Sequence, residues 1–303
     1  MSSLGSASVP QPAAALPDAV VATREPLAGP PKQKGGITGT VVLSIGAVIW
    51  ISPLVLLLIT SVRPLADFIA SGPLTWPNEF TWKNFTDAWN VGKFATTYRN
   101  SMILLLLKVP IGVLLSSMLA YALSKLRIRF RSTIMFAVFL GLTIPIYITI
   151  VPVFIMLRSM GITDNLLGLV GPYLAFGIPF QVLVLQSFFR QLPDELIEAA
   201  RMDGASMIST FWHVAVPAAR PATAILGLFT FMTAWTDFLW PLLVLNAGNP
   251  TLQTALSQLQ SARYVDYSIV LAGAIMATLP LLVLFIVAGK QLISGIMQGA
   301  VKG

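Results

Sequence analysis

Two ionisable residues, Lys108 and Asp237, lie inside long apolar stretches of this sequence. Hydrocarbon disfavours a charge that is neither paired nor facing a polar cavity, so each is a functional hypothesis by default. Counted along helices, Lys108 is seven residues from Ser101 and Asp237 nine from Asn246, which gives both a similar depth. We therefore expect Lys108 and Asp237 to form an intramembrane ion pair. The alternatives are a Lys108 side chain extended outward to the interface and a local amide cap for Asp237.

Few other residue types here could do covalent or metal chemistry. The sequence has no cysteine, which excludes a disulfide framework, a thiolate metal site and a cysteine nucleophile. Its single histidine, His213, is expected to pack against a partner rather than to bind metal or carry protons. Residues 288–291 imitate a phosphate loop but lack its leading glycine and its magnesium-binding Ser or Thr. We expect no catalytic, cofactor-binding or metal-binding residue in this chain, and therefore no enzyme activity.

Six apolar windows must position these side chains. They cover residues 37–62, 101–123, 133–157, 169–189, 223–247 and 268–288. Each is near or above the roughly 20 residues that span a bilayer as a helix. Charged residues make up 10% of the chain, against about 25% in soluble domains, which excludes a soluble enzyme, a disordered protein and a nucleic-acid-binding domain. We predict an all-α, polytopic membrane protein with six transmembrane helices, kinked by a proline inside every window.

The remaining segments predict the domains and the topology. Residues 1–36 are rich in proline and alanine, and we expect a disordered cytoplasmic tail before a transmembrane domain, 37–303. With the N-terminus inside, the inner segments hold twice as many Lys and Arg as the outer ones, and the loop 124–132 alone holds four. Cytoplasmic loops carry this excess, so we predict that both termini are cytoplasmic. The long outer loop 63–100 is expected to contain a surface helix.

The segment between the fourth and fifth windows, residues 190–222, has the pattern of two short helices joined by a turn; we call it the knuckle. Asp203-Gly204 supplies the turn, because glycine accepts left-handed torsions without steric cost. Ser206 can cap the second helix, which we expect to end at Pro217. The knuckle is too apolar to remain alone in water, so it should dock onto a partner.

The knuckle resembles a known family. Glu198-Ala199-Ala200, Gly204 and the Val-Ala-Val-Pro at 214–217 are similar to the EAA motif of binding-protein-dependent ABC importer permeases. In that motif EAA is followed by three residues, a glycine, nine residues and Ile-x-Leu-Pro. The spacing fits throughout, and valine replaces both the isoleucine and the leucine.

A second element points to one branch of this family. Trp235-Thr236-Asp237-Phe238 is similar to the Trp-Asn-Asp/Glu-Phe element of the carbohydrate (maltose-type) branch, with Thr236 in place of asparagine. The C-terminal Gly-Ala-Val-Lys-Gly also looks like the ending common in that branch. The resemblance covers about residues 40–303.

The resemblance implies a transmembrane permease subunit of an ATP-driven importer, which translocates a sugar or an oligosaccharide across a bacterial plasma (inner) membrane. The implied partners are a second permease subunit in a heterodimer, two cytoplasmic ATPase subunits that hold ATP and Mg²⁺, an extracellular solute-binding protein and the lipid bilayer, and no nucleic acid. The implied coupling residues are Glu198, Ala199, Ala200, Asp203, Gly204 and Pro217. We predict that Gly204→Asp clashes at the turn and abolishes uptake while the chain still inserts.

A path for a sugar needs polar groups that match hydroxyls, together with aromatic faces. The candidates are Tyr147, Tyr173, Gln181, Trp235, Asp237 and Trp240. For each of them helix-to-helix hydrogen bonding is an alternative role, and the companion permease could hold the main binding site. Two other functions stay open: the same architecture for a non-sugar solute such as glycerol phosphate or an amino acid, and an ion-coupled secondary transporter. The latter would need several buried carboxylates, whereas only Asp237 is available.

Overall fold

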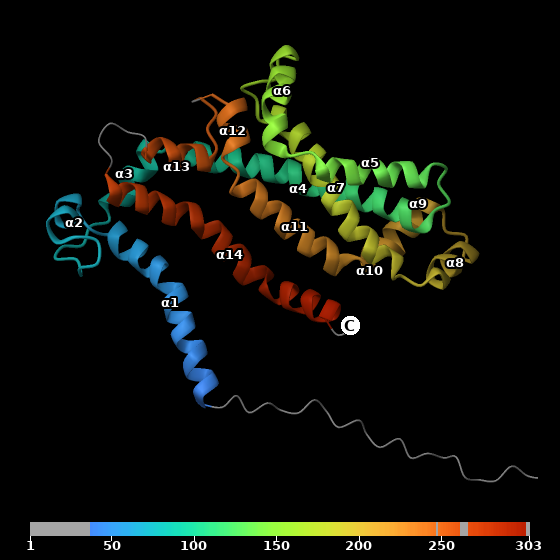
Figure 1. Ribbon diagram of the computed structural model, residues 1–303, viewed down its shortest axis with the longest axis horizontal. Helices are drawn as coiled ribbons and strands as arrows, with labels where there is room; N and C mark the ends of the chain where they lie inside the picture. Colours follow the sequence, from blue (N-terminus) through green and yellow to red (C-terminus); the bar gives the residue numbers. More distant parts are fainter. Residues whose placement is uncertain (1–36, 247, 261–265, 301–303) are drawn as a thin grey trace, which may run out of the picture. The chain divides into compact units, whose positions relative to one another are not determined.

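The computed structural model describes residues 37–246, 248–260 and 266–300 (Figure 1). Every regular element in these ranges is helical. The helices are α1 (Ile37–Ser61), α2 (Leu65–Ser71), α3 (Lys83–Val91), α4 (Phe94–Lys125), α5 (Arg131–Thr143), α6 (Ile146–Ser159), α7 (Leu166–Arg190), α8 (Asp194–Met202), α9 (Met207–Thr210), the π-helical turn η1 (Phe211–Ala215), α10 (Val216–Ala218), α11 (Arg220–Trp235), α12 (Leu239–Val244), α13 (Leu252–Gln260) and α14 (Tyr267–Ala300). The chain divides into two units, residues 1–51 and 52–303, with the boundary inside α1. The predicted tail, 1–36, lies outside the described residues.

Four of the described helices are long and apolar enough to cross a membrane: α1, α4, α7 and the Tyr267–Gly289 part of α14. Two further pairs of helices, α5 with α6 and the helical segment Met207–Ala218 with α11, qualify only when each bent pair counts as one span. This gives up to six spans. Many large apolar side chains on these helices are exposed, including Leu106, Ile148 and Ile286. Such surfaces suit lipid contact. The prediction of an all-α chain with several membrane-spanning helices is confirmed at this level.

The third window, 133–157, forms two helices where the sequence predicts one kinked helix. α5 ends before Ile144, and α6 starts after Pro145 at an angle of 99°. A proline disfavours the helical conformation of the residue before it, and Ile144 is indeed extended, with φ −75° and ψ 114°. Pro145 also has no backbone N–H to continue the helical ladder. The predicted kink is therefore a complete break.

The fifth window, 223–247, is also broken. α11 ends at Trp235, and α12 begins at Leu239. Between them, Asp237 Oδ1 accepts a hydrogen bond of 3.1 Å from the backbone N of Leu239. Asp favours this local bond over a place within a helix, because its short side chain reaches the backbone two residues on. The local amide cap, one of the alternatives for Asp237, is thus present, and it coincides with the end of α11.

The loop 63–100 contains two helices, α2 and α3, and also the first turns of α4. Arg63 is fully buried, and its guanidinium donates hydrogen bonds to the Asp67 carboxylate and to the backbone oxygen of Gly72. The hydrogen bond from the Asn78 side chain lowers the pKa of Asp67, which keeps this carboxylate charged beside Arg63. The loop is therefore an ordered structure at neutral pH.

Within the unit 52–303, α4 packs along α7 and α11, and the three run side by side (Figure 1). One cluster of buried side chains joins the ends of α4 and α7 to the knuckle, with the Tyr121 ring against those of Phe189 and Phe211. A second cluster lies under α12, where Trp240 packs against Phe176. These two clusters fix the elements that carry the candidate sites.

A set of hydrogen bonds ties the linker between α6 and α7 to the loop after α12. The backbone N of Asp164 donates to Val244 O at 2.7 Å. The Asp164 carboxylate accepts hydrogen bonds from the backbone N and the side-chain amide of Asn246, and Asn249 donates to Asp164 O. Asp164 adopts φ 61°, a left-handed conformation that aspartate tolerates better than most residues. The ends of the two broken windows are therefore held together.

Candidate functional site

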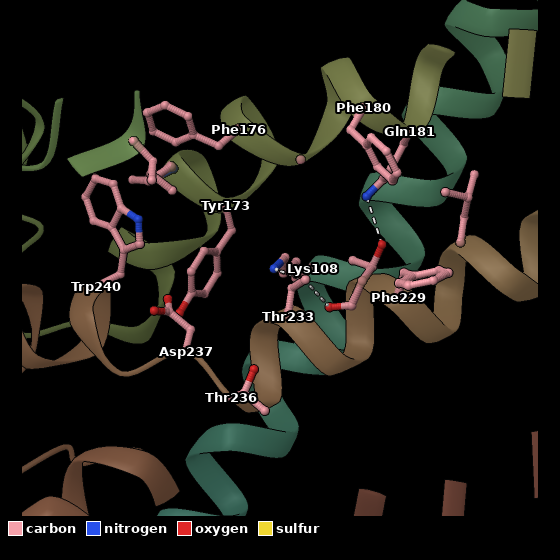
Figure 2. A pocket seen from close by; sticks show the side chains of 15 residues that line it. Lys108, Tyr173, Phe176, Phe180, Gln181, Phe229, Thr233, Thr236, Asp237 and Trp240 are labelled. Carbon is pink, nitrogen blue, oxygen red and sulfur yellow. Dashed lines mark hydrogen bonds between the residues drawn. The ribbon is translucent and has the colours of Figure 1, made fainter. Parts of the chain in front are cut away.

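A cavity of about 590 Å³ is lined by residues of α4, α6, α7, α11 and α12 and of the break between α11 and α12 (Figure 2). Its polar lining residues include Lys108, Tyr173, Gln181, Thr233 and Asp237. The apolar lining consists largely of aromatic rings from Phe176, Phe180, Phe229 and Trp240. An apolar cavity with a few converging polar groups is the usual form of a small-molecule site.

Lys108 and Asp237 line the same cavity, in agreement with their similar depth in the sequence. In the described part of the chain, ion pairs join Arg63 to Asp67 and Lys125 to Asp194, and none joins Lys108 to Asp237. The ammonium of Lys108 lies 4.4 Å from the centre of the Tyr173 ring and donates to Thr233 Oγ1 at 3.3 Å. Both contacts stabilise the cation. The predicted ion pair between Lys108 and Asp237 is not formed in this structure.

Two buried polar atoms of the cavity lack hydrogen-bond partners among the described residues: the Tyr173 hydroxyl and Asp237 Oδ2. Figure 2 shows the Tyr173 hydroxyl directed toward the Asp237 carboxylate. Tyr173 itself is only 7% exposed. Unpaired buried polar atoms are rare in folded proteins, because they lose their hydrogen bonds to water.

The six candidate path residues fall into three groups. Tyr173, Gln181, Asp237 and Trp240 line the large cavity. Tyr147, which is 74% exposed, lines an adjoining cavity of about 380 Å³ that shares Asp237 and Trp240. Trp235 lines neither of them: it is 2% exposed, stacks on Phe231 and donates from Nε1 to Ala277 O at 2.9 Å. In this structure Trp235 is a packing residue between α11 and α14.

The sequence reasoning missed the lining residues Thr230, Thr233, Phe176, Phe180 and Phe229. Their helical spacing is a signal that could have found them. Thr233 and Thr230 precede Asp237 by four and seven residues, and Phe176 and Phe180 follow Tyr173 by three and seven. Residues at such spacings share one face of a helix.

Gln181 also joins three helices. Its Oε1 accepts a hydrogen bond from Ser116 of α4 at 2.9 Å, and its Nε2 donates to Thr230 of α11 at 2.9 Å. All three residues are buried. The helix-to-helix role considered for Gln181 is therefore present, although the side chain also borders the cavity.

We predict that Gln181→Leu destabilises the bundle, because it leaves the Ser116 and Thr230 hydroxyls without this partner. The expected loss is roughly 1–2 kcal/mol, the size of interhelical hydrogen bonds in membrane proteins. Thermal unfolding of the purified chain in detergent should show a lower midpoint. The control is Gln191→Leu, since Gln191 is exposed and its amide bonds only to Ser187 one turn earlier. Equal midpoints for both variants would contradict the role of the bridge.

The turn of the knuckle follows a defined helix-ending geometry. Gly204 has φ +84°, its N donates to Arg201 O, and the N of Ala205 donates to Ala200 O at 2.9 Å. These two bonds around a left-handed glycine form a Schellman motif at the end of α8. A Cβ at position 204 would meet no atom within 4 Å. The steric clash predicted for Gly204→Asp is therefore wrong, and the constraint at this position is the backbone torsion.

The second half of the knuckle confirms one prediction and corrects another. Ser206 caps α9 by accepting a hydrogen bond from Ser209 N. Pro217 does not end the helix: it lies inside α10, and the helix bends by 77° only at the junction with α11. The π-helical turn η1 precedes it, with Val216 N bonded five residues back to Phe211 O. This wider turn shifts the hydrogen-bond register before the proline, which can then follow without breaking the helix.

The knuckle has a buried side and an exposed side. Ile197, Phe211 and Ala215 pack into the cluster at the ends of α4 and α7. Five large apolar side chains on α8, α9 and η1 are exposed; we call them the coupling face: Leu196, Met202, Met207, Ile208 and Trp212. Glu198 and Ala199 are exposed beside them, and Ala200 is half-buried. His213 is exposed too, with Nδ1 3.0 Å from Ser209 O.

A charged side chain fixes the start of the knuckle to α4. Lys125, in the last turn of α4, donates from Nζ to Leu192 O at 2.5 Å and to Asp194 Oδ1 at 2.6 Å. The Lys125 side chain is nearly buried, whereas the Asp194 side chain is mostly exposed. The basic loop 124–132 and the knuckle therefore lie at the same end of the bundle.

Comparison with known proteins gives consistent results. Residues 112–290 match the family described as "Binding-protein-dependent transport system inner membrane component". The chain is 31% identical over 267 residues to the diacetylchitobiose uptake system permease protein NgcG of Streptomyces coelicolor, covering 86% of this chain and 87% of the relative. It is 30% identical over 261 residues to the arabinooligosaccharides transport system permease protein AraQ of Halalkalibacterium halodurans, covering 85% and 93%.

The fold has a counterpart among solved structures. The crystal structure of a bacterial ABC transporter involved in the import of the acidic polysaccharide alginate contains a chain that superposes with a TM-score of 0.70. The match covers 88% of this chain and 99% of that chain, at 24% sequence identity. At this identity the likeness concerns the fold alone.

Proposed function

The chain belongs to the family of binding-protein-dependent transport system inner membrane components, and from this premise we propose that it is the transmembrane permease subunit of an importer for a sugar or an oligosaccharide. The observation that carries the proposal is the similarity over most of the chain to two permeases named for oligosaccharides, diacetylchitobiose and arabinooligosaccharides. The cavity supports it, because it combines aromatic walls with buried hydrogen-bonding groups.

In this proposal the chain crosses a bacterial plasma membrane six times, with α5 and α6 together as the third span, α11 and α12 together as the fifth, and both termini and the 1–36 tail in the cytoplasm. The contact between Lys125 and Asp194 supports this topology. It brings the basic loop 124–132 and the knuckle to one end of the bundle, and short basic loops favour the cytoplasmic side. The knuckle would then face the cytoplasm.

The knuckle is proposed to couple this chain to one of two cytoplasmic ATPase subunits, which hold ATP and Mg²⁺. The coupling face supplies exposed apolar side chains for a partner protein to cover. Glu198, Ala199, Ala200, Asp203, Gly204 and Pro217 are the proposed coupling residues. The Schellman turn and the buried side of the knuckle make it a compact body, so that movement of the ATPase would displace it as one piece.

The cavity is proposed to form part of the translocation path, together with a second permease subunit in a heterodimer. Phe180 and Phe229 on its wall are about half exposed in the isolated chain, which supports a neighbouring subunit beside them. Tyr147, Tyr173, Gln181, Asp237 and Trp240 are the proposed path residues of this chain. An extracellular solute-binding protein, as the family description implies, would deliver the sugar.

Purification of the tagged chain with its accompanying subunits, followed by reconstitution into vesicles, tests this function. We expect an ATPase subunit to copurify and labelled sugars such as diacetylchitobiose or arabinotriose to accumulate only when ATP and the binding protein are supplied. Accumulation of solute by this chain alone, driven by an ion gradient, would show a secondary transporter instead. ATP-driven uptake of glycerol phosphate or an amino acid, without uptake of any sugar, would keep the architecture and change the substrate.

A further inference from the structure

We propose that this subunit itself contacts the transported sugar, through a hydroxyl-binding subsite formed by the Asp237 carboxylate and the Tyr173 phenol in the cavity wall. The inference rests on the proposed function and deepens it, because it places a substrate contact in this chain rather than wholly in its companion. The subsite joins the break between α11 and α12 to the face of α7 (Figure 2).

The two groups retain unused hydrogen-bonding capacity. Among the described residues, neither the Tyr173 hydroxyl nor Asp237 Oδ2 has a partner, and both atoms are buried. The neighbouring polar groups are already engaged: Asp237 Oδ1 accepts from Leu239 N, and Lys108 contacts Thr233 and the Tyr173 ring. Unlike the Tyr121 hydroxyl, which is also buried without a partner, these two atoms belong to residues that line the cavity, so a ligand in the cavity can supply the missing partner.

A sugar hydroxyl fits both groups at once. It is a neutral group that donates one hydrogen bond and accepts others, so it can donate to Asp237 Oδ2 and accept from the Tyr173 hydroxyl. The Tyr173 hydroxyl is directed toward the carboxylate, which places the two partners side by side. Hydrogen bonds to a charged acceptor are stronger than those between neutral groups, which makes Asp237 the stronger contact.

The charges of the cavity favour a neutral ligand. Lys108 would repel a cationic ligand, and Asp237 would repel an anionic one, because both line the same cavity. The exposed rings of Phe180 and Phe229 in the cavity wall offer apolar surface for the C–H face of a pyranose. The volume of about 590 Å³ lies within the usual range of small-molecule sites. These features fit a neutral sugar.

The test compares Tyr173→Phe and Asp237→Asn in the importer that copurifies with the full chain, reconstituted with its binding protein. Both changes are nearly isosteric, and the side-chain oxygen of the introduced asparagine can still accept from Leu239 N. The measured quantities are the KM and maximal rate of ATP-driven uptake for labelled diacetylchitobiose, arabinotriose and maltose. We expect KM to rise about fivefold for Tyr173→Phe and tenfold or more for Asp237→Asn, as the loss of one hydrogen bond to a ligand predicts.

Tyr121→Phe is the matched control. The Tyr121 hydroxyl is also buried without a partner among the described residues, but it lies outside the cavity, beside Phe189 and Phe211. We expect its KM to equal that of the unmodified importer. Copurification of the other subunits and the basal ATPase rate show whether each variant is folded and assembled, and the two cavity variants give independent readings.

Each outcome of these uptake measurements either supports or contradicts the proposed subsite. A raised KM in the cavity variants but not in Tyr121→Phe supports the subsite. An unchanged KM in an assembled cavity variant, with normal sugar uptake by the unmodified importer, overturns the subsite and leaves the sugar importer intact. Failure of the unmodified importer to take up any of the three sugars, with an active ATPase, counts against the proposed function, and the subsite falls with it.

Discussion

Met202→Glu combined with Ile208→Glu is expected to lower ATP-driven uptake at least tenfold, while the chain still inserts into the membrane. Met202 and Ile208 are 88% and 69% exposed on the coupling face. If both are buried against the ATPase, each contributes roughly 1.5–3 kcal/mol, and a factor of ten in affinity corresponds to about 1.4 kcal/mol. Two buried carboxylates without partners add a further penalty.

The measurement is the amount of ATPase subunit that copurifies with the tagged chain, together with uptake into vesicles. The matched control is Met202→Leu with Ile208→Leu, which keeps the apolar surface and should keep both quantities close to their original values. A double glutamate variant that retains its ATPase and transports normally would show that the coupling face is not the interface.

Gly204→Val is expected to reduce uptake about tenfold, because it forces a β-branched residue into the left-handed conformation of the Schellman turn. A left-handed residue with a side chain costs roughly 1–2 kcal/mol, and β-branched residues lie at the upper end. The chain can avoid this cost by opening the turn, which would tilt α8 away from α9. The space around position 204 is empty, so the volume of the side chain plays no part.

Gly204→Asn separates torsion from volume, because asparagine tolerates the left-handed conformation far better than valine. We expect Gly204→Asn to keep most of its uptake, with equal amounts of all three forms in the membrane. If asparagine proved as harmful as valine, contact between this position and a partner would explain the effect better. Normal uptake by Gly204→Val would remove the turn from the coupling mechanism.

The sequence predicts the membrane-spanning character well, because the separation of charged from apolar residues along the chain does not depend on any three-dimensional contact. It does not predict where the helices break. Pro145 could end a helix or only kink it, and the extended conformation of Ile144 decides which. Asp237 could pair with Lys108 or cap α12, and the bond to Leu239 N becomes visible only in three dimensions.

The knuckle is predictable in part for a local reason. Gly204 and Ser206 act on backbone groups within a few residues, so their types and spacing indicate the turn and the cap directly. The place of Pro217 inside a helix cannot be predicted locally, because the π-helical turn that accommodates it packs against Tyr121 of α4. That packing involves residues far apart in the sequence.

The candidate site, too, depends on contacts between residues that are far apart in the sequence. Depth along a helix correctly places Lys108 and Asp237 at one cavity, but the Tyr173 ring that holds Lys108 comes from another helix. Trp235 and Trp240 look equivalent in the sequence, since both flank Asp237. The break after Trp235 separates them: Trp240 borders the cavity, and Trp235 packs toward α14.

α4 runs unbroken from Phe94 to Lys125, through Pro110. Lys125 binds Asp194, the first residue of α8, and Lys108 lies in the wall of the cavity, 17 residues earlier and about 26 Å away along the axis. One continuous helix therefore connects the wall of the cavity with the end of the bundle that binds the knuckle. A displacement of the knuckle should therefore reach the cavity through α4 itself, with Pro110 as the position between them where this helix can bend.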